Sequence, residues 1–116
     1  LSLKYADELI ALSKLEKNYL YLHRGYYQKG NKNRLIGDLN KALNDFFKSA
    51  EAASKAKFIT GKGVAYMSIA DVYSIMGNAN NAEVYYTKSI DLLRKTKDSI
   101  ALASALLNEL LTFKYK

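Results

Sequence analysis

Two apolar stripes with helical spacing, separated by a Gly-Asn pair, constrain the fold of this chain more than any other feature. The first stripe runs from Tyr66 to Met76 and the second from Ala82 to Leu93, and their apolar residues recur at intervals of three or four. That spacing places the apolar side chains on one face of an α-helix. Gly77 between the stripes can take a positive φ without steric cost, which ends a helix. The stretch therefore predicts two antiparallel amphipathic helices.

The residues of this predicted hairpin resemble a tetratricopeptide repeat. That family has an aromatic residue, a Leu-Gly/Ala pair and a Tyr in its first helix, then a Gly-Asp/Asn turn, and Ala, aromatic and Ala positions in its second helix. The matching residues here are Tyr66, Ile69-Ala70, Tyr73, Gly77-Asn78, Ala82, Tyr86 and Ser89. Ser replaces the last Ala, and the usual closing Pro is missing because the chain has no Pro.

The resemblance implies an all-α fold of stacked antiparallel helical hairpins. We expect about two to three repeats with five or six helices, forming one helical-repeat domain over residues 1–116. The series Ala42, Phe46 and Ser49 matches the second-helix positions of the hairpin and predicts another second helix. We expect that helix to run from Leu35 to about Lys57.

The N-terminal segment also predicts a helix, over residues 1–16. The inward-facing residues that we expect from its spacing are Tyr5, Leu9 and Leu12, with Ala6 as a further candidate. Ala6, Ile10 and Ser13 also match the Ala, aromatic and Ser series, which would make this segment the second helix of an earlier, truncated repeat. Either a turn at residues 16–18 or a helix continuing to Lys29 is compatible with the sequence.

The turns of the earlier repeats are harder to locate. We place the end of the helix that starts at Tyr19 near Gly30 and Asn31. The alternative is a turn at Gly37, because Ile36-Gly37-Asp38 precedes Ala42 just as Met76-Gly77-Asn78 precedes Ala82. Residues 59–63, which include two Gly, predict the turn between repeats.

Asp98 is the predicted N-cap of a last helix that starts at Ser99. The apolar residues of this helix repeat the Tyr66 pattern 37 residues later, at Ala103, Leu106, Leu107 and Leu110. No partner helix follows, so we expect an open array whose last helix forms a homodimer or packs against a continuation of the array. The chain starts at Leu1 and not at Met, so we expect a fragment of a longer array, and its compartment stays open.

The sequence predicts no catalytic, cofactor-binding or metal-binding site. The chain has no Cys and a single His, His23, and nothing places that His beside a Ser and a carboxylate. The carboxylates lack a metal-binding spacing. Gly61-Lys62-Gly63 lacks the rest of a phosphate-binding loop. We therefore expect a protein that is not an enzyme and that has no cofactor.

The net charge of +7 permits an acidic partner or nucleic acid. The Lys residues are scattered, so we favour a solvated basic surface. Basic residues between Arg24 and Arg34 alternate with Tyr26 and Tyr27, as nucleic-acid sites can, but we expect Tyr26 in the core. No apolar run approaches the length of about 18 residues that a membrane span needs, so we expect no membrane insertion.

The resemblance further implies a non-catalytic protein-protein interaction module. In the family, the first helix of each repeat lines a concave groove that holds a peptide or protein segment. The partner-binding candidates carried over to this chain are Arg24, Tyr27, Val64, Met67, Asp71, Ser74, Ser104, Asn108 and Leu111. One subset of the family clamps acidic C-terminal carboxylates with Lys and Asn, and Met67, Ser68 and Asp71 at the corresponding places argue against that clamp.

Two alternatives remain for the function. The repeat spacing of 37 to 40 residues resembles that of sensory or regulatory repeat domains attached to bacterial histidine kinases and transcription regulators. The second alternative is a helical domain that binds nucleic acid, which we do not favour.

Overall fold

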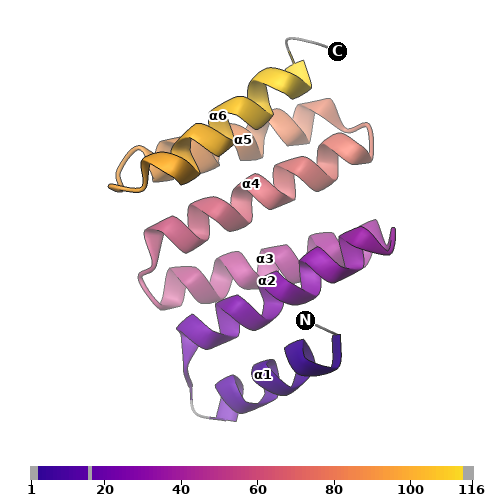
Figure 1. Cartoon of the computed structure of the whole chain (residues 1–116), viewed down its shortest axis with the longest axis vertical. Coiled ribbons are helices and arrows are strands. Elements are labelled where there is room, and N and C mark those ends of the chain that lie inside the picture. Colours follow the sequence, from indigo (N-terminus) through magenta and orange to yellow (C-terminus); the bar gives the residue numbers. More distant parts are fainter. Residues whose placement is uncertain (1–2, 16, 114–116) are drawn as a thin grey trace. The chain divides into compact units, whose positions relative to one another are not determined.

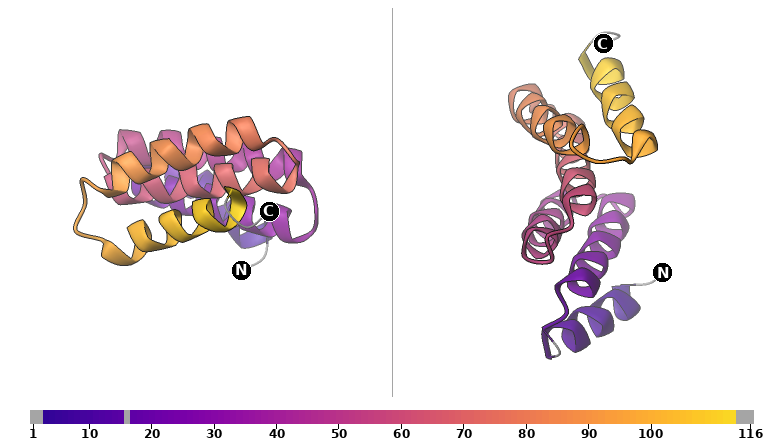
Figure 2. Two further views of the ribbon diagram at one scale, coloured as in Figure 1. Left: turned by 90° about the horizontal axis from the view of Figure 1, so that it is seen from above. Right: turned by 90° about the vertical axis from the view of Figure 1, so that its left-hand side faces the viewer.

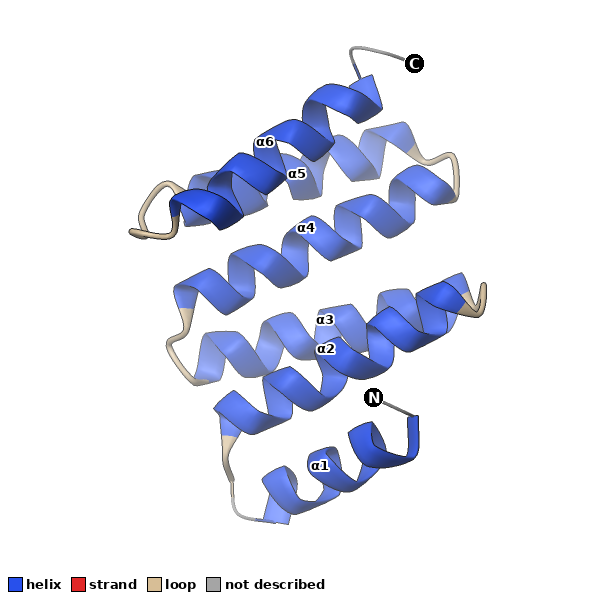
Figure 3. Cartoon of the chain, viewed as in Figure 1, coloured by secondary structure: helices blue, strands red, loops and turns tan. Residues whose placement is uncertain are grey.

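The structure, a computed structural model, describes residues 3–15 and 17–113 and is helical with no strand over those residues (Figures 1 and 3). The helices described are α1 (Leu3–Leu15), α2 (Tyr19–Leu35), α3 (Leu39–Lys55), α4 (Ile59–Ile75), α5 (Ala79–Leu93) and α6 (Ser99–Phe113). They form two compact units, Leu1–Phe58 with α1 to α3 and Ile59–Lys116 with α4 to α6. Within each unit, adjacent helices pack as hairpins, which confirms the expected all-α fold.

Helix starts recur with a fixed period. Helices α2 to α6 begin at residues 19, 39, 59, 79 and 99, so a hairpin of two helices repeats every 40 residues. The residue before a helix caps it when its side-chain oxygen accepts the backbone N–H three residues later, and this occurs at Asn18, Asp38, Asn78 and Asp98. The predicted N-cap at Asp98 is thus confirmed.

Four turns share one geometry. Lys17, Gly37, Lys57 and Gly77 have φ values of 53°, 84°, 57° and 80°. The N–H of the residue after each donates to the carbonyl five residues earlier at 2.8–2.9 Å, which is the Schellman ending of a helix. The predicted turn at Gly77 is confirmed, and the turn at Lys17 rules out a helix that continues to residue 29.

Two predicted turns were wrong. Helix α2 continues through Gly30 and ends before Gly37, so α3 begins at Leu39 and not at residue 35. Likewise, the turn between hairpins lies at Lys57, and residues 59–63 form the first turns of α4. In both places the glycine serves packing and not a turn, because a Cβ at Gly30 would lie 2.7 Å from the Phe46 ring. A Cβ at Gly63 would lie equally close, 2.7 Å, to the side chain of Leu93.

The interior of the second unit agrees with the predicted hairpin. Ala70 on α4 and Ala82 and Tyr86 on α5 form one buried cluster. Tyr73 and Tyr85 pack against this cluster with their rings stacked, 5.8 Å between centroids. Small residues therefore let α4 and α5 approach closely, while the aromatic rings fill the space around them.

Helix α1 buries a different face from the one that spacing predicted. Ala6, Ile10 and Ser13 are buried, whereas Tyr5 and Leu12 are 61% and 58% exposed. The buried set matches the Ala, aromatic and Ser positions of α3 and α5, as a second helix of an earlier repeat would. The α2 backbone at Gly25 selects this face, because an ideal Cβ there would lie 2.8 Å from Ile10 Cγ1.

Helix α6 follows α5 after residues 94–98, a longer connection than the three-residue turns (Figure 2). Its register follows the 40-residue repeat and not the predicted 37-residue offset, since buried Ala105 corresponds to buried Ala65. The exposed apolar patch expected here is present, with Leu106, Leu107 and Leu110 exposed by 37%, 53% and 42%. Among the described residues, no helix combines the length and apolar character that a membrane span requires.

Candidate functional site

The predicted partner-binding residues divide between the two units. In the second unit α4 and α6 pack against each other and together carry Val64, Met67, Asp71, Ser74, Ser104, Asn108 and Leu111. Arg24 and Tyr27 lie on α2 in the first unit. The candidate site described below is therefore the α4–α6 surface, defined by those seven residues.

Much of the α4 part of this surface contacts α6. Val64 and Met67 are half-buried, and both pack against the cluster of Ile90, Leu93 and Ala105. The outer part of the surface comes from α6, where Ser104 is exposed and Leu111 is 54% exposed. A partner would thus meet mainly α6 side chains, with the α4 residues beneath them.

Asp71 joins the three helices of the second unit. Its carboxylate accepts a short hydrogen bond from the Tyr86 hydroxyl and a longer one, 3.4 Å, from Asn108 Nδ2. The Tyr86 hydroxyl also lies 3.4 Å from Thr112 Oγ1. Burial raises the pKa of Tyr86, and the hydrogen bond to Asp71 raises it further, so the phenol stays protonated as a donor. Asp71 therefore holds α5 and α6 against α4.

The two candidates on α2 differ in accessibility. Arg24 is exposed, and its guanidinium lies 5.8 Å from the centroid of the Tyr21 ring. Tyr27 is half-buried, with its ring 6.1 Å from that of His23 and 5.5 Å from that of Phe46. Of the two, Arg24 has the more accessible side chain.

His23, for which the sequence indicated no catalytic partner, is packed in the interior of the first unit. It is 6% exposed, with Nδ1 2.8 Å from Ser49 Oγ and its ring edge-on to Phe58 at 5.7 Å. Burial lowers the pKa of His23, while the hydrogen bond with the Ser49 carbonyl opposes the shift. Within the described ranges, no group of three or more His, Asp or Glu is arranged to hold a metal ion.

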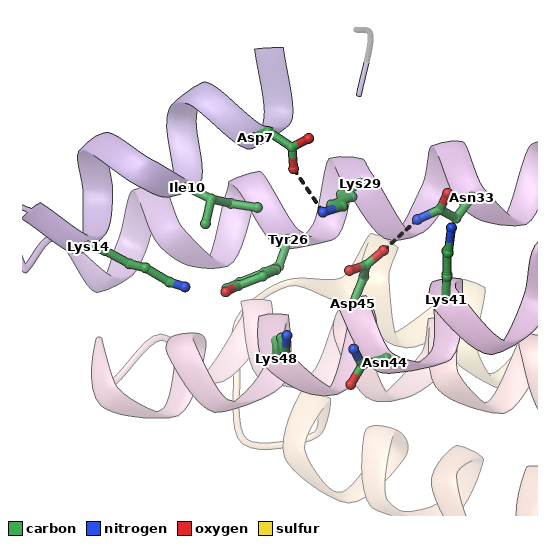
Figure 4. Close-up of a pocket in the computed structure, with 10 residues that line it drawn as sticks. All are labelled: Asp7, Ile10, Lys14, Tyr26, Lys29, Asn33, Lys41, Asn44, Asp45 and Lys48. Carbon is green, nitrogen blue, oxygen red and sulfur yellow. Dashed lines mark hydrogen bonds and ion pairs between the residues drawn. The ribbon is translucent and has the colours of Figure 1, made fainter. Parts of the chain in front are cut away.

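A polar groove in the first unit was missed by sequence reasoning. It lies between α1, α2 and α3 and has a volume of about 440 Å³ (Figure 4). Charged and amide side chains dominate its lining, which includes Asp7, Lys14, Lys29, Asn33, Lys41, Asn44, Asp45 and Lys48. The signal that could have found it is the 40-residue register, which aligns Lys29 and Asp45 with Ile69 and Tyr85.

Comparison with known proteins adds no relative. No protein-family model matches the chain, and no curated protein sequence matches it.

Proposed function

We propose that this chain is a helical-repeat module of the tetratricopeptide type that binds a protein or peptide segment without catalysis. The proposed binding face is the α4–α6 surface, which corresponds to the groove side of first helices in that family. Recognition would be non-covalent, through shape, apolar anchors and hydrogen bonds from a rigid support.

One observation carries the proposal: the repeat keeps the buried Ala, aromatic and Ser positions of its second helix and changes the face of its first helix. Buried Ala42, Phe46 and Ser49 of α3 correspond to buried Ala82, Tyr86 and Ser89 of α5, 40 residues later. On the proposed face, by contrast, Val64, Met67 and Asp71 of α4 correspond to Ser104, Leu107 and Leu111 of α6. Leu107 lies on the same side of α6 as Ser104 and Leu111, at helical spacing, and is counted with the α4–α6 surface from here on. A repeated interior with a varied outer face is the organisation expected of a scaffold that presents recognition residues.

The chemistry of the face suits a segment with apolar anchors. Leu107 and Leu111 are exposed by 53% and 54%, so they can contact a partner directly. Half-buried Met67 has an unbranched side chain that adapts to varied shapes. Ser104 supplies a hydroxyl at the edge of this apolar area.

The proposal can be tested without knowing the natural partner. The immobilised chain is first used to select binding peptides from a displayed random library. The selected peptides should then change the NMR chemical shifts of backbone amides on α4 and α6. Leu111→Glu should weaken their binding by about tenfold, the effect of losing a central apolar contact. Val84→Glu places the same charge on the outer side of α5, at a residue 47% exposed, and should have little effect. Enrichment of no peptide, or a footprint confined to other helices, would contradict this function.

We also propose that a further helix covers the open face of α6. Ala103, Leu106 and Leu110 occupy the positions of Gly63, Tyr66 and Ala70, which contact α5 within the α4–α5 hairpin. Leu106 and Leu110 are exposed by 37% and 42%. The covering helix would come from a second copy of the chain or from a continued array.

A further inference from the structure

The polar groove of the first unit is longer than a single hollow. A second hollow of about 270 Å³ adjoins the one of about 440 Å³, and both are lined by Lys14, Tyr26 and Lys48. Lys14 comes from α1, Tyr26 from α2 and Lys48 from α3, so these three residues mark the middle of the groove (Figure 4). A groove that continues on both sides of this point suits an elongated ligand.

The middle of this groove carries positive charge that no carboxylate neutralises by direct contact. Lys29 is paired with Asp7 at 2.8 Å, and this hydrogen bond raises the pKa of Lys29. Lys14 and Lys48, in contrast, form no ion pair within the described residues. Their ammonium groups lie instead near the Tyr26 ring, at 5.8 and 5.6 Å from its centroid. Two cations from different helices thus face the same short stretch of groove.

The floor of the groove is also polar. Asn33 and Asp45 are 3% and 5% exposed, and Asn33 Nδ2 donates to Asp45 Oδ2 at 2.7 Å. Burial raises the pKa of Asp45, although the bond from Asn33 opposes the shift. Burying such a pair costs free energy compared with apolar side chains, so its presence needs a reason.

The second unit supplies the internal comparison. At the positions 40 residues later, Tyr73 and Tyr85 stack where the first unit has Asn33 and Asp45. The same shift aligns Lys29 with Ile69, which is 0% exposed. The hairpin of two helices therefore forms without polar residues at these places, and their presence in the first unit is not a requirement of the fold.

We propose that this groove binds an acidic, extended segment of a partner protein, with carboxylate side chains of the segment contacting Lys14 and Lys48. Charge complementarity and the groove's length favour this occupant. Small molecules bind mainly in enclosed, mostly apolar pockets, whereas this groove is open and polar. The proposal shares with the proposed function the premise of a protein partner, but it uses different residues in a different unit.

The test uses the full chain and a fluorescein-labelled peptide of alternating Glu and Gly, with anisotropy as the readout. The peptide should bind, the matched Gln and Gly peptide should not, and binding should weaken as salt rises from about 0.05 to about 0.3 M. Lys14→Gln with Lys48→Gln should weaken binding by about tenfold, the effect of losing two exposed ion pairs. Lys88→Gln with Lys95→Gln removes the same charge from the second unit and should change binding by less than about twofold.

A third variant separates charge from packing. Lys14→Arg with Lys48→Arg keeps both cations and should retain binding, while all variants should keep the helical circular dichroism of the parent chain. Equal weakening by the two Gln pairs, or no binding of the Glu peptide, would overturn the proposal. Displacement of the peptide by inorganic phosphate at constant ionic strength would also overturn it, by assigning the groove to a small anion. Leu111→Glu, which tests the α4–α6 surface, should leave this binding unchanged, so the two proposals fail separately.

Discussion

Ser49 donates its hydroxyl to the main-chain carbonyl of His23 at 3.0 Å, and this bond joins α3 to α2 inside the first unit. Forty residues later, Ser89 donates to the carbonyl of Gly63 at 2.7 Å. Both serine side chains are fully buried. The repeated bond satisfies a polar side chain in the interior and sets how one helix lies along the other.

Removing this bond should destabilise the second unit. Ser89→Ala deletes the donor to a buried carbonyl, and we expect a loss of about 1–2 kcal/mol in the free energy of unfolding. Urea unfolding followed by circular dichroism measures the change. Thr87→Ala on the exposed side of α5 is the control and should stay within about 0.5 kcal/mol of the parent. Equal effects of the two substitutions would show that the bond contributes little.

The close approach of α4 and α5 gives a second prediction. Ala82 is 0% exposed in the cluster with Ala70 and Tyr86, so Ala82→Leu should overpack the contact and cost about 1–3 kcal/mol. Ala79→Leu places the same side chain at an exposed position of α5 and is the matched control. An unchanged denaturation midpoint for Ala82→Leu would mean that the two helices do not pack through these residues.

The stability of the first unit should decrease in mild acid. Because burial lowers the folded-state pKa of His23 from 6.5, the unfolded chain binds more protons as the pH falls through that value. The contribution of neutral His23 to the free energy of unfolding is therefore fully present above pH 6.5, and it is lost as the pH falls through the lowered pKa. Asp45 affects stability at lower pH and in the opposite direction. Because burial raises its folded-state pKa from 3.8, its protonation favours the folded state.

The measurement is the urea midpoint of unfolding between about pH 7.5 and about pH 5.5, the range in which a His titrates. The parent chain should lose stability across this range. His23→Gln, which cannot titrate, should show a flatter dependence. The same slope in both proteins would assign the loss to other groups.

Exposure of the α6 face predicts self-association of the chain at high concentration. Lys in place of Leu106 and Leu110 should shift the mass measured by light scattering toward the monomer, because burying charge in an apolar contact is costly. Lys in place of Ile100 and Val84, which are 81% and 47% exposed, adds the same charge elsewhere. A parent chain that is monomeric at every concentration would contradict the dimer. A continued array would then be the remaining proposal for what covers α6.

The sequence predicts part of the candidate sites. The α4–α6 residues became candidates because first-helix positions recur in the repeat, and the structure shows that Ser104 and Leu111 are exposed. The hydrogen bonds that Asp71 accepts from Tyr86 and Asn108 were not predictable, because they depend on how α5 and α6 pack against α4. The groove at Lys14 and Lys48 was missed for a similar reason, since its walls come from α1 and α3 and are brought together only by packing on α2.

Features that depend only on neighbouring residues were predictable from the sequence. Apolar spacing determined that α4 and α5 are helices, and Gly77 before Asn78 determined the turn between them, because φ preference and capping are local. The roles of the other glycines depend on contacts between helices. Gly30 and Gly37 look alike in sequence, yet Gly30 makes room for the Phe46 ring from another helix while Gly37 ends α2. A close approach depends on a partner far along the chain, so no local pattern distinguishes it from a turn.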